Sequence, residues 1–348
     1  MDALLSPRRR HVLAALGAAA LGSACGLRTE DATRALRLAG HAMGSTWSAR
    51  IAGGPFDAAF ERRAHEAVAG AIDAVVARMS TFDATSELAR FNGHTATTPF
   101  ALSADTLAVL ARAQAIAAAS QGAFDVTVAP LVGAWGFGAG AAARASAPTS
   151  AELAAPVGWR QLVLDAAAGT ARKAHPELRL DLSGIAKGYA VDRAALALEA
   201  LGIDRYMVEA GGEIRTRGRN AEGRPWQIAV ERPDAWPQRA HRIVPLAGAS
   251  IATSGDYRNW YEQDGRRIHH EIDPVTRAPA AHALASASVV HADCTEADAW
   301  ATALFVCGPE RGLALAREHG LAALFIVREA GGALRDIASP AFDALDTA

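Results

Sequence analysis

Several large classes of protein are excluded by what this chain lacks. Three cysteines in 348 residues are too few for a disulfide scaffold, and no Cys-x-x-Cys or His-rich spacing suggests zinc. No apolar run reaches the ~20 residues that span a bilayer. With a net charge of −2 and no basic stripe, the chain is not expected to bind nucleic acid. What remains is a globular chain, 51% hydrophobic, with enough core for one large domain or two intimate ones.

Three common motifs of ligand binding and catalysis are also missing. The chain has no Gly-x-x-x-x-Gly-Lys-Ser/Thr phosphate loop. It has no Gly-x-Ser-x-Gly, so an α/β-hydrolase would lack its nucleophile elbow. No Gly-x-Gly-x-x-Gly lies between a predicted strand and a helix, which disfavours a Rossmann dinucleotide domain.

The first 25 residues have the pattern of an export signal. Three arginines precede a short run of small and apolar residues that ends at Ala24. An arginine pair followed by x-Val-Leu resembles a twin-arginine signal. The stretch Leu-Gly-Ser-Ala-Cys at 21–25 resembles a bacterial lipoprotein cleavage site. We expect residues 1–25 to direct the protein to the periplasmic face, with a lipid anchor at Cys25 and a tether over 26–40. The alternative is an ordinary cleaved signal with an incidental cysteine.

The two remaining cysteines leave two interpretations open. Cys294 and Cys307 flank a predicted helix. After export they could form a disulfide, or both could pack as small buried hydrophobic residues. The second interpretation is the favoured one.

Hydrophobic periodicity predicts an α+β protein. Helical spacing occurs over 58–79, from a Ser103 cap to residue 120, and over 185–201. Two further helices are expected at 295–305 and 308–319. Residues 86–92 are expected to form a short turn and 139–158 a surface loop. Many strands follow one another without helices between them, which favours a mixed or antiparallel sheet; they are expected at 42–51, 178–182, 206–209, 213–218, 226–231, 268–274, 286–291 and, as the last, 321–327.

One segment combines a carboxylate, a hydroxyl, a glycine and a lysine at the start of a predicted helix. It runs Asp-Leu-Ser-Gly-Ile-Ala-Lys-Gly over 181–188, after an alternating run of leucines that predicts a strand. Backbone N–H groups and the helix dipole favour an anion at such a position. The segment therefore predicts a site for a phosphate-bearing ligand.

Two other groups of residues suggest metal and acid–base chemistry. Asp298 and Thr302 lie four apart on a helix and offer hard oxygen ligands, which suit Mg²⁺ better than zinc. An ordinary polar helix face would look the same. His270, after His269, is a candidate general base, because a histidine near neutral pKa exchanges protons readily. A solvent-exposed or capping histidine is the alternative.

Shorter patterns are ambiguous when taken singly. The Gly-Gly pair at 211–212 allows either a close approach of backbone to a ligand or a β-bulge. Thr-Ser-Gly at 253–255 could bind phosphate or form a plain turn. Met43, Phe82 and Phe124 could line a ring pocket or pack in the core.

Taken together, these stretches resemble the ApbE family of flavin transferases that act on FAD. The motifs occur in the family's order across nearly the whole chain after the signal. They are Met-Gly-Ser-Thr at 43–46, Met-Ser-Thr-Phe at 79–82, Gly-Ala-Phe-Asp-Val-Thr-Val-Ala-Pro-Leu-Val at 122–132, Trp-Gly-Phe-Gly at 135–138, Leu-Asp-Leu-Ser-Gly-Ile-Ala-Lys-Gly-Tyr-Ala-Val-Asp at 180–192, Gly-Gly-Glu-Ile at 211–214, Ala-Thr-Ser-Gly-Asp-Tyr at 252–257, His-Glu-Ile-Asp-Pro at 270–274 and Ala-Asp-Ala-Trp-Ala-Thr at 297–302.

The resemblance implies an ApbE-like fold over 41–335, with an FAD site between two intimately packed lobes, and a tail over 336–348. It implies Mg²⁺-dependent transfer of FMN from FAD to a Thr or Ser hydroxyl of an acceptor protein, with release of AMP. By the same resemblance, the metal ligands are Asp298, Thr302 and the Gly184 carbonyl, and His270 is the base. The implied flavin and nucleotide contacts are Met43, Phe82, Ala123, Phe124, Asp125, Asp181, Lys187 and Ile272.

The chain departs from the family pattern at two positions. Arg277 follows Thr276 where members usually carry Gly, which could alter the turn beside His270. Phe82 stands where many members carry Tyr, so the ring is kept and a hydroxyl is lost. Two other functions stay open: an FAD pyrophosphatase that gives FMN and AMP, and a non-enzymatic FAD-binding envelope lipoprotein. Any contact with a membrane is expected only through Cys25.

Overall fold

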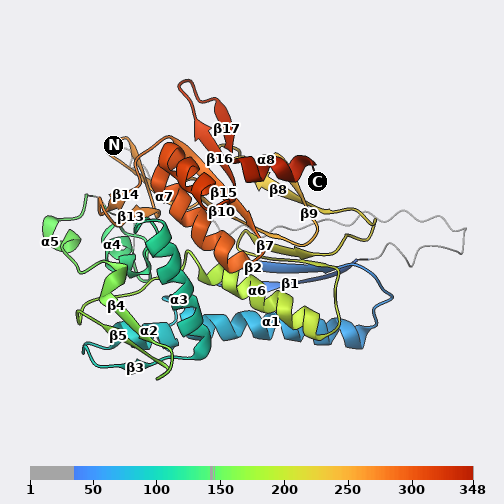
Figure 1. Cartoon of the computed structure of the whole chain (residues 1–348), viewed down its shortest axis with the longest axis horizontal. Coiled ribbons are helices and arrows are strands. Elements are labelled where there is room, and N and C mark those ends of the chain that lie inside the picture. Colours follow the sequence, from blue (N-terminus) through green and yellow to red (C-terminus); the bar gives the residue numbers. More distant parts are fainter. Residues whose placement is uncertain (1–34, 142–143, 145, 348) are drawn as a thin grey trace, which may run out of the picture. The chain divides into compact units, whose positions relative to one another are not determined.

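An eight-stranded antiparallel sheet lies at the centre of the computed structural model, which describes residues 35–141, 144 and 146–347 (Figure 1). Its strand order is β1-β2-β6-β7-β10-β15-β16-β17, and each neighbouring pair is antiparallel. The strands are β1 Leu36–Ala42, β2 Ser45–Ile51, β6 Tyr206–Ala210, β7 Glu213–Arg217, β10 Ser250–Gly255, β15 Leu284–His291, β16 Ala322–Arg328 and β17 Leu334–Ala338. The predicted α+β class is confirmed, and the sheet is the antiparallel kind.

Three long helices cover one face of this sheet. They are α1 (Ala58–Met79), α6 (Ala186–Ala200) and α7 (Cys294–Glu318), and α6 packs against both of the others. In Figure 1, α1 and α6 run side by side below the sheet, with α7 above them. The sequence predicts all three, because apolar residues recur at helical spacing. At the start of α1 the Asp57 side chain also caps the helix, accepting a hydrogen bond of 2.6 Å from the Phe60 N–H.

A ribbon and a short helix cover the opposite face. Strands β8 (Trp226–Glu231) and β9 (Ala240–Leu246) pair with each other, and α8 (Pro340–Asp343) follows β17. Their apolar side chains form one core cluster with the sheet, and Phe342 of α8 is 1% exposed. The expected tail over 336–348 is therefore wrong: its described part completes the sheet and closes the core, and 321–327 is not the last strand.

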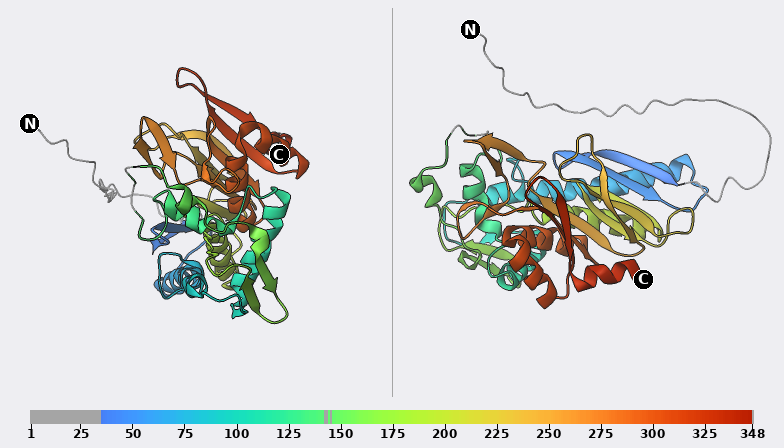
Figure 2. Two further views of the ribbon diagram at one scale, coloured as in Figure 1. Left: turned by 90° about the vertical axis from the view of Figure 1, so that its left-hand side faces the viewer. Right: turned by 90° about the horizontal axis from the view of Figure 1, so that it is seen from above.

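The remaining elements lie near one end of the sheet, on the left of Figure 1 (see also Figure 2). Two small sheets, β3-β5-β4 and β13-β14, and the β11-β12 hairpin belong to this group. The elements are α2 Glu87–Gly93, β3 Phe100–Ala101, α3 Ala104–Ala119, α4 Ala129–Ala134, α5 Ser150–Leu153, β4 Leu162–Asp165, β5 Thr170–Lys173, β11 Trp260–Gln263, β12 Arg266–His269, β13 Ile272–Asp273 and β14 Ala278–Pro279.

Two predicted elements begin or end elsewhere. Residues 42–51 were expected to be one strand, but a Met43-Gly44 turn divides the segment, and β1 starts at Leu36. The tether is thus shorter than 26–40. Its first part, to residue 34, and the predicted signal with Cys25 lie outside the described residues. The expected turn at 86–92 is the helix α2, which Ser86 caps by accepting a hydrogen bond from the Ala89 N–H.

The strand expected before the 181–188 motif is wrong. Leu178, Leu180 and Leu182 are fully buried, as the alternation predicts, but the segment joins no ladder. Its N–H groups bond elsewhere: Leu180 donates to the Asn92 side chain and Asp181 to the Val126 carbonyl, both at 2.7 Å. Alternation reports which side chains are buried, and this segment is buried without a neighbouring strand.

The two helices expected at 295–305 and 308–319 are confirmed as halves of α7. Gly308 is non-helical (φ 74°, ψ 176°) and Pro309 follows, so the helix kinks there. Cys294 and Cys307 are both free thiols on this helix. Within the described residues, no helix is long and apolar enough to span a membrane.

Candidate active site

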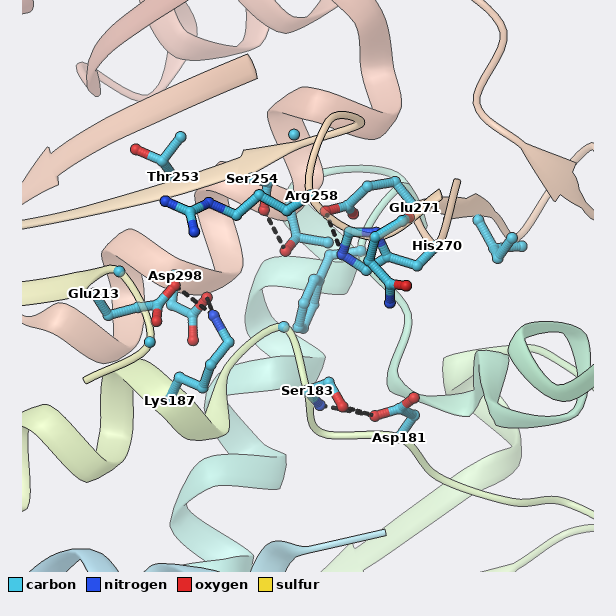
Figure 3. Close-up of a pocket in the computed structure, with 18 of the residues that line it drawn as sticks. Asp181, Ser183, Lys187, Glu213, Thr253, Ser254, Arg258, His270, Glu271 and Asp298 are labelled. Atoms are coloured by element: carbon cyan, nitrogen blue, oxygen red, sulfur yellow. Dashed lines mark hydrogen bonds and ion pairs between the residues drawn. The ribbon is translucent and has the colours of Figure 1, made fainter. Parts of the chain in front are cut away.

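A cavity of about 490 Å³ opens beside the starts of α6 and α7, a volume in the usual range for ligand sites (Figure 3). It collects every predicted site residue except Met43, and these are Phe82, Ala123, Phe124, Asp125, Asp181, Gly184, Lys187, His270, Ile272, Asp298 and Thr302. Met43 occupies the β1–β2 turn with a φ of 54° and packs against the core. Its flavin contact stays a prediction.

The three candidate metal ligands all line this cavity. Asp298 is 3% exposed, and its Oδ2 accepts a hydrogen bond of 2.9 Å from the Gly188 N–H. The Thr302 Oγ1 lies 3.0 Å from the Ser254 Oγ. Gly184 approaches so closely that a Cβ added there would lie 2.9 Å from the Thr302 Oγ1. Only glycine leaves that space between Gly184 and Thr302 free.

The chemistry of this donor set suits a hard cation. It offers a carboxylate, a hydroxyl and a backbone carbonyl, all oxygen, which Mg²⁺ prefers. Over the described ranges, no group of three or more His, Cys, Asp or Glu side chains is arranged to hold a metal. A metal here would therefore need ligands from the bound substrate, as Mg²⁺ commonly takes from phosphates.

Lys187 lies among carboxylates beside these ligands. Its ammonium pairs with Glu213, and the Nζ is 3.9 Å from the Asp298 Oδ1. Burial would lower the pKa of Lys187, but Glu213 and Asp298 outweigh it and raise that pKa. Burial in turn raises the pKa of Glu213 and of Asp298, and Lys187 opposes this. The buried Glu213 Oε2 has no hydrogen-bond partner. The Lys187 ammonium and the Glu213 Oε2, which has no hydrogen-bond partner, thus belong to two residues that line the cavity.

Glu213 reaches Lys187 because of the Gly-Gly pair. Residues 211 and 212 form the two-residue turn of the β6–β7 hairpin, with φ values of 65° and 108°. Both angles lie in the left-handed region, which glycine adopts freely. The register of the two strands is continuous across the turn, so the β-bulge alternative is wrong.

His270 lies between β12 and β13, across the cavity from Lys187 (Figure 3). Its Nδ1 is 3.3 Å from the Asn259 carbonyl oxygen, which fixes the ring with the proton on Nδ1. The Nε2 then carries the lone pair and lies 3.5 Å from the Glu271 Oε1. Desolvation lowers the pKa of His270 to about 4. The imidazole is therefore neutral at pH 7, and its pKa lies below the near-neutral value expected of a histidine base.

Asp125 and Asp181 brace loops of the cavity wall. The Asp125 Oδ1 accepts from the Thr127 N–H and Oγ1, and its Oδ2 accepts from the Trp159 N–H at 2.8 Å. Asp181 accepts from the Ser183 N–H at 2.8 Å and the Ser183 Oγ at 2.6 Å. Burial raises the pKa of Asp125, and the three donors oppose this. Both carboxylates hold the backbone near the ligand space; direct flavin contacts through them stay predictions.

The departure from the family pattern at Arg277 lies in a turn close to His270. Arg277 has a φ of 59°, the left-handed conformation that a glycine would adopt more easily. The Arg277 guanidinium donates to the carbonyls of Leu153 and Ala155, at 2.6 and 2.9 Å, and the Trp135 indole donates to the Arg277 carbonyl. These bonds offset the conformational cost of a non-glycine residue at this position.

Glu213, Glu271, Ser254 and Arg258 are among the lining residues that the sequence did not place in the predicted site. Glu271 is 7% exposed, and burial raises its pKa to about 8. Ser254 bonds the candidate metal ligand Thr302. Arg258 pairs with Glu231 and lies at the upper side of the cavity in Figure 3. A glutamate inside an otherwise buried segment was the available signal for Glu271. Ser254 and Arg258 carried none beyond the short Thr-Ser-Gly pattern.

His269 anchors the strand that presents His270, and this predicts a pH dependence of stability. It is 5% exposed, its Nε2 lies 2.9 Å from the Ala280 carbonyl oxygen, and burial lowers its pKa from 6.5 to about 4. The unfolded chain binds this proton more readily, so the free energy of unfolding falls as pH drops from 6.5 to 4, by up to about 3 kcal/mol.

Urea unfolding of the wild type and of His269→Gln at pH 7 and pH 4.5 measures this effect. The variant is expected to lose less stability than the wild type between the two pH values, because glutamine does not titrate. Equal losses in the two proteins would contradict the assignment to His269.

The fold and cavity together define an α+β protein with a substrate-sized cavity of mixed apolar and charged walls. The ApbE family model matches residues 43–325. The FAD:protein FMN transferase of Haemophilus influenzae is 41% identical over 307 residues, covering 86% of this chain and 88% of the relative. That of Vibrio cholerae is 40% identical over 336 residues, 96% of this chain and 98% of the relative.

Solved structures agree with these sequence relationships. The flavin transferase ApbE from Vibrio cholerae superposes with a TM-score of 0.81 at 40% identity, over 89% of this chain and 99% of that one. The chain belongs to the ApbE family. The resemblance drawn from its motifs is thereby confirmed.

Proposed function

We propose that this protein is an FAD:protein FMN transferase, which joins FMN from FAD to a Thr or Ser hydroxyl of an acceptor protein and releases AMP. The observation that carries the proposal is a single cavity lined by Asp298, Thr302 and His270, with His270 across from Asp298 in Figure 3. Relatives named for this activity match nearly the whole chain. An FAD-storing lipoprotein would need neither a cation corner nor a base.

In this proposal, different residues bind the metal, stabilise charge and accept the proton. Asp298, Thr302 and the Gly184 carbonyl would hold Mg²⁺, which when bound neutralises diphosphate charge and polarises the phosphorus. Lys187 adds a fixed positive charge beside the same place. The His270 Nε2 accepts the proton of the acceptor hydroxyl, because an alcohol is a poor nucleophile at neutral pH. Transfer of this kind otherwise depends on positioning and charge.

The apolar wall of the cavity suits a flavin ring. Phe124 is buried behind Gly184, whereas Phe82 is 72% exposed at the mouth. Ala123 and Ile272 complete the apolar surface. An aromatic side chain so exposed at a cavity mouth gains burial when a flat ring stacks on it.

The test mixes the purified full chain with FAD, Mg²⁺ and a candidate acceptor protein. Flavin fluorescence on the acceptor in a denaturing gel, and free AMP in solution, are the expected results. A mutated acceptor without the target hydroxyl should stay unlabelled. Free FMN and AMP with no labelled acceptor would overturn the proposal in favour of an FAD pyrophosphatase.

We also propose that residues 1–25 export the protein and that Cys25 carries a lipid, which would place the site on the periplasmic face beside envelope acceptors. The support is the sequence pattern of the signal. Growth with a fatty-acid probe should label the wild type and not Cys25→Ala. An unlabelled wild type in the soluble periplasmic fraction would favour the simple cleaved signal.

A further inference from the structure

Asp192 on α6 is a buried carboxylate to which the proposed chemistry gives no role. It is 7% exposed, and both of its oxygens are occupied. Oδ1 accepts from the Cys294 N–H at 3.0 Å and from the Arg215 Nη1 at 2.5 Å. Oδ2 accepts from the Thr295 N–H at 2.9 Å and from its Oγ1 at 2.6 Å. Three of these four donors belong to the first turn of α7.

The first backbone N–H groups of α7 need hydrogen-bond acceptors from outside the helix. The first N–H groups of any helix have no acceptor within it. The residue at the usual capping position, Asp293, makes no capping bond with its side chain. Asp192 supplies the missing acceptors from the neighbouring helix, and its negative charge is favourable at a helix N-terminus.

The candidate metal ligands continue the same face of α7. Asp298 and Thr302 follow Thr295 by three and seven residues, so all three project from one side of the helix. On α6, one turn before Asp192, the Gly188 N–H bonds the Asp298 Oδ2. A Cβ on Gly188 would lie 2.3 Å from the Cys294 carbonyl oxygen, so the two helices touch here. Helices α6 and α7 are therefore joined at two successive places. Asp192 bonds the first turn of α7, and the Gly188 N–H bonds the candidate metal ligand Asp298.

We propose that Asp192 is a positioning residue for the metal site. By holding the first turn of α7 against α6, it keeps Asp298 and Thr302 at a fixed distance from Gly184, which lies just before α6. The inference rests on the proposed function, in which these three residues hold Mg²⁺. Loss of a residue that supports metal ligands typically weakens metal binding by about 10- to 100-fold.

The test compares metal binding by the full-length wild type and Asp192→Asn. Mn²⁺ binding in the presence of FAD is followed by electron paramagnetic resonance, and the Mg²⁺ dependence of transfer is measured separately. The variant is expected to bind Mn²⁺ at least about tenfold more weakly and to recover most of its turnover at saturating Mg²⁺. A lower melting temperature with unchanged Mn²⁺ affinity would overturn the proposal, because the residue would then be only structural.

Glu199→Gln is the matched control. Glu199 lies on the same helix and also pairs with an arginine of β7, Arg217, at 2.7 Å, but no bond joins it to α7. Its substitution should leave the Mn²⁺ affinity unchanged. Equal weakening in this control would contradict the role of Asp192.

Thr295 provides a second pair of variants if Asp192→Asn does not fold. Thr295→Val removes only the hydroxyl that bonds Asp192, and Thr295→Ser keeps it. The valine variant should weaken Mn²⁺ binding and the serine variant should restore it; equal affinities would overturn the inference. Because Mn²⁺ binding is read without an acceptor, a wild type that binds Mn²⁺ but labels no acceptor would refute the proposed transfer alone.

Discussion

His270→Ala is expected to reduce FMN transfer by about 10² to 10⁴-fold, the usual contribution of a general base, while FAD still binds. The imidazole is neutral at pH 7 and His270 lines the cavity, with its Nε2 3.5 Å from the Glu271 Oε1, whereas alanine offers no proton acceptor. Single-turnover labelling of an acceptor measures the rate, and quenching of flavin fluorescence measures binding.

The control is His241→Ala, since His241 lies on β9, bonds Asp336 and does not line the cavity. It should label the acceptor at the wild-type rate. Full activity in His270→Ala would remove His270 from the role of base. Lost FAD binding in that variant would instead assign the residue to substrate binding.

The second large effect is expected at Asp298. In Asp298→Asn, the side chain keeps an oxygen for the Gly188 N–H but loses the charge that attracts a cation. Turnover should fall, and the Mg²⁺ concentration for half-maximal rate should rise at least about 100-fold, more than the loss of a supporting partner causes. A Mg²⁺ titration of the transfer rate, with Mn²⁺ binding in parallel, measures both quantities.

Glu296→Gln serves as the control for this substitution. Glu296 precedes Asp298 by two residues on α7, but it pairs with Arg112 outside the cavity. Its Mg²⁺ dependence should equal that of the wild type. An unchanged Mg²⁺ response in Asp298→Asn would exclude that carboxylate from the metal site.

The helices of this protein were largely predictable, because a capping residue and a run of apolar side chains are local features. Both ends of α1 and the kink after residue 307 are examples. The strands were less predictable. The leucines at 178–182 alternate like a strand and are buried like one, yet this segment bonds the Asn92 side chain and the Val126 carbonyl in place of a neighbouring strand. The sequence shows burial here but not which backbone supplies the hydrogen bonds.

The same distinction applies to the site. Motif order identified the family. Of the twelve site residues that the motifs predicted, eleven line the cavity and Met43 lies outside it. Motif order did not single out Glu271, whose importance depends on lying 3.5 Å from the His270 Nε2. Nor did it show that Asp192, the last residue of a recognised motif, bonds a helix more than a hundred residues later.

By itself, the sequence determined the α+β class, the main helices, the family and the chemical types gathered at the site, because each of these is written in composition, periodicity or a local motif. Only the tertiary structure decided which of those groups meet. The contact of α6 with α7 at Gly188 places Asp298 beside Lys187, and the β6–β7 turn carries Glu213 to the same corner. Such contacts join residues that are distant in the chain. Burial of these residues away from water then shifts the pKa values of their ionisable groups.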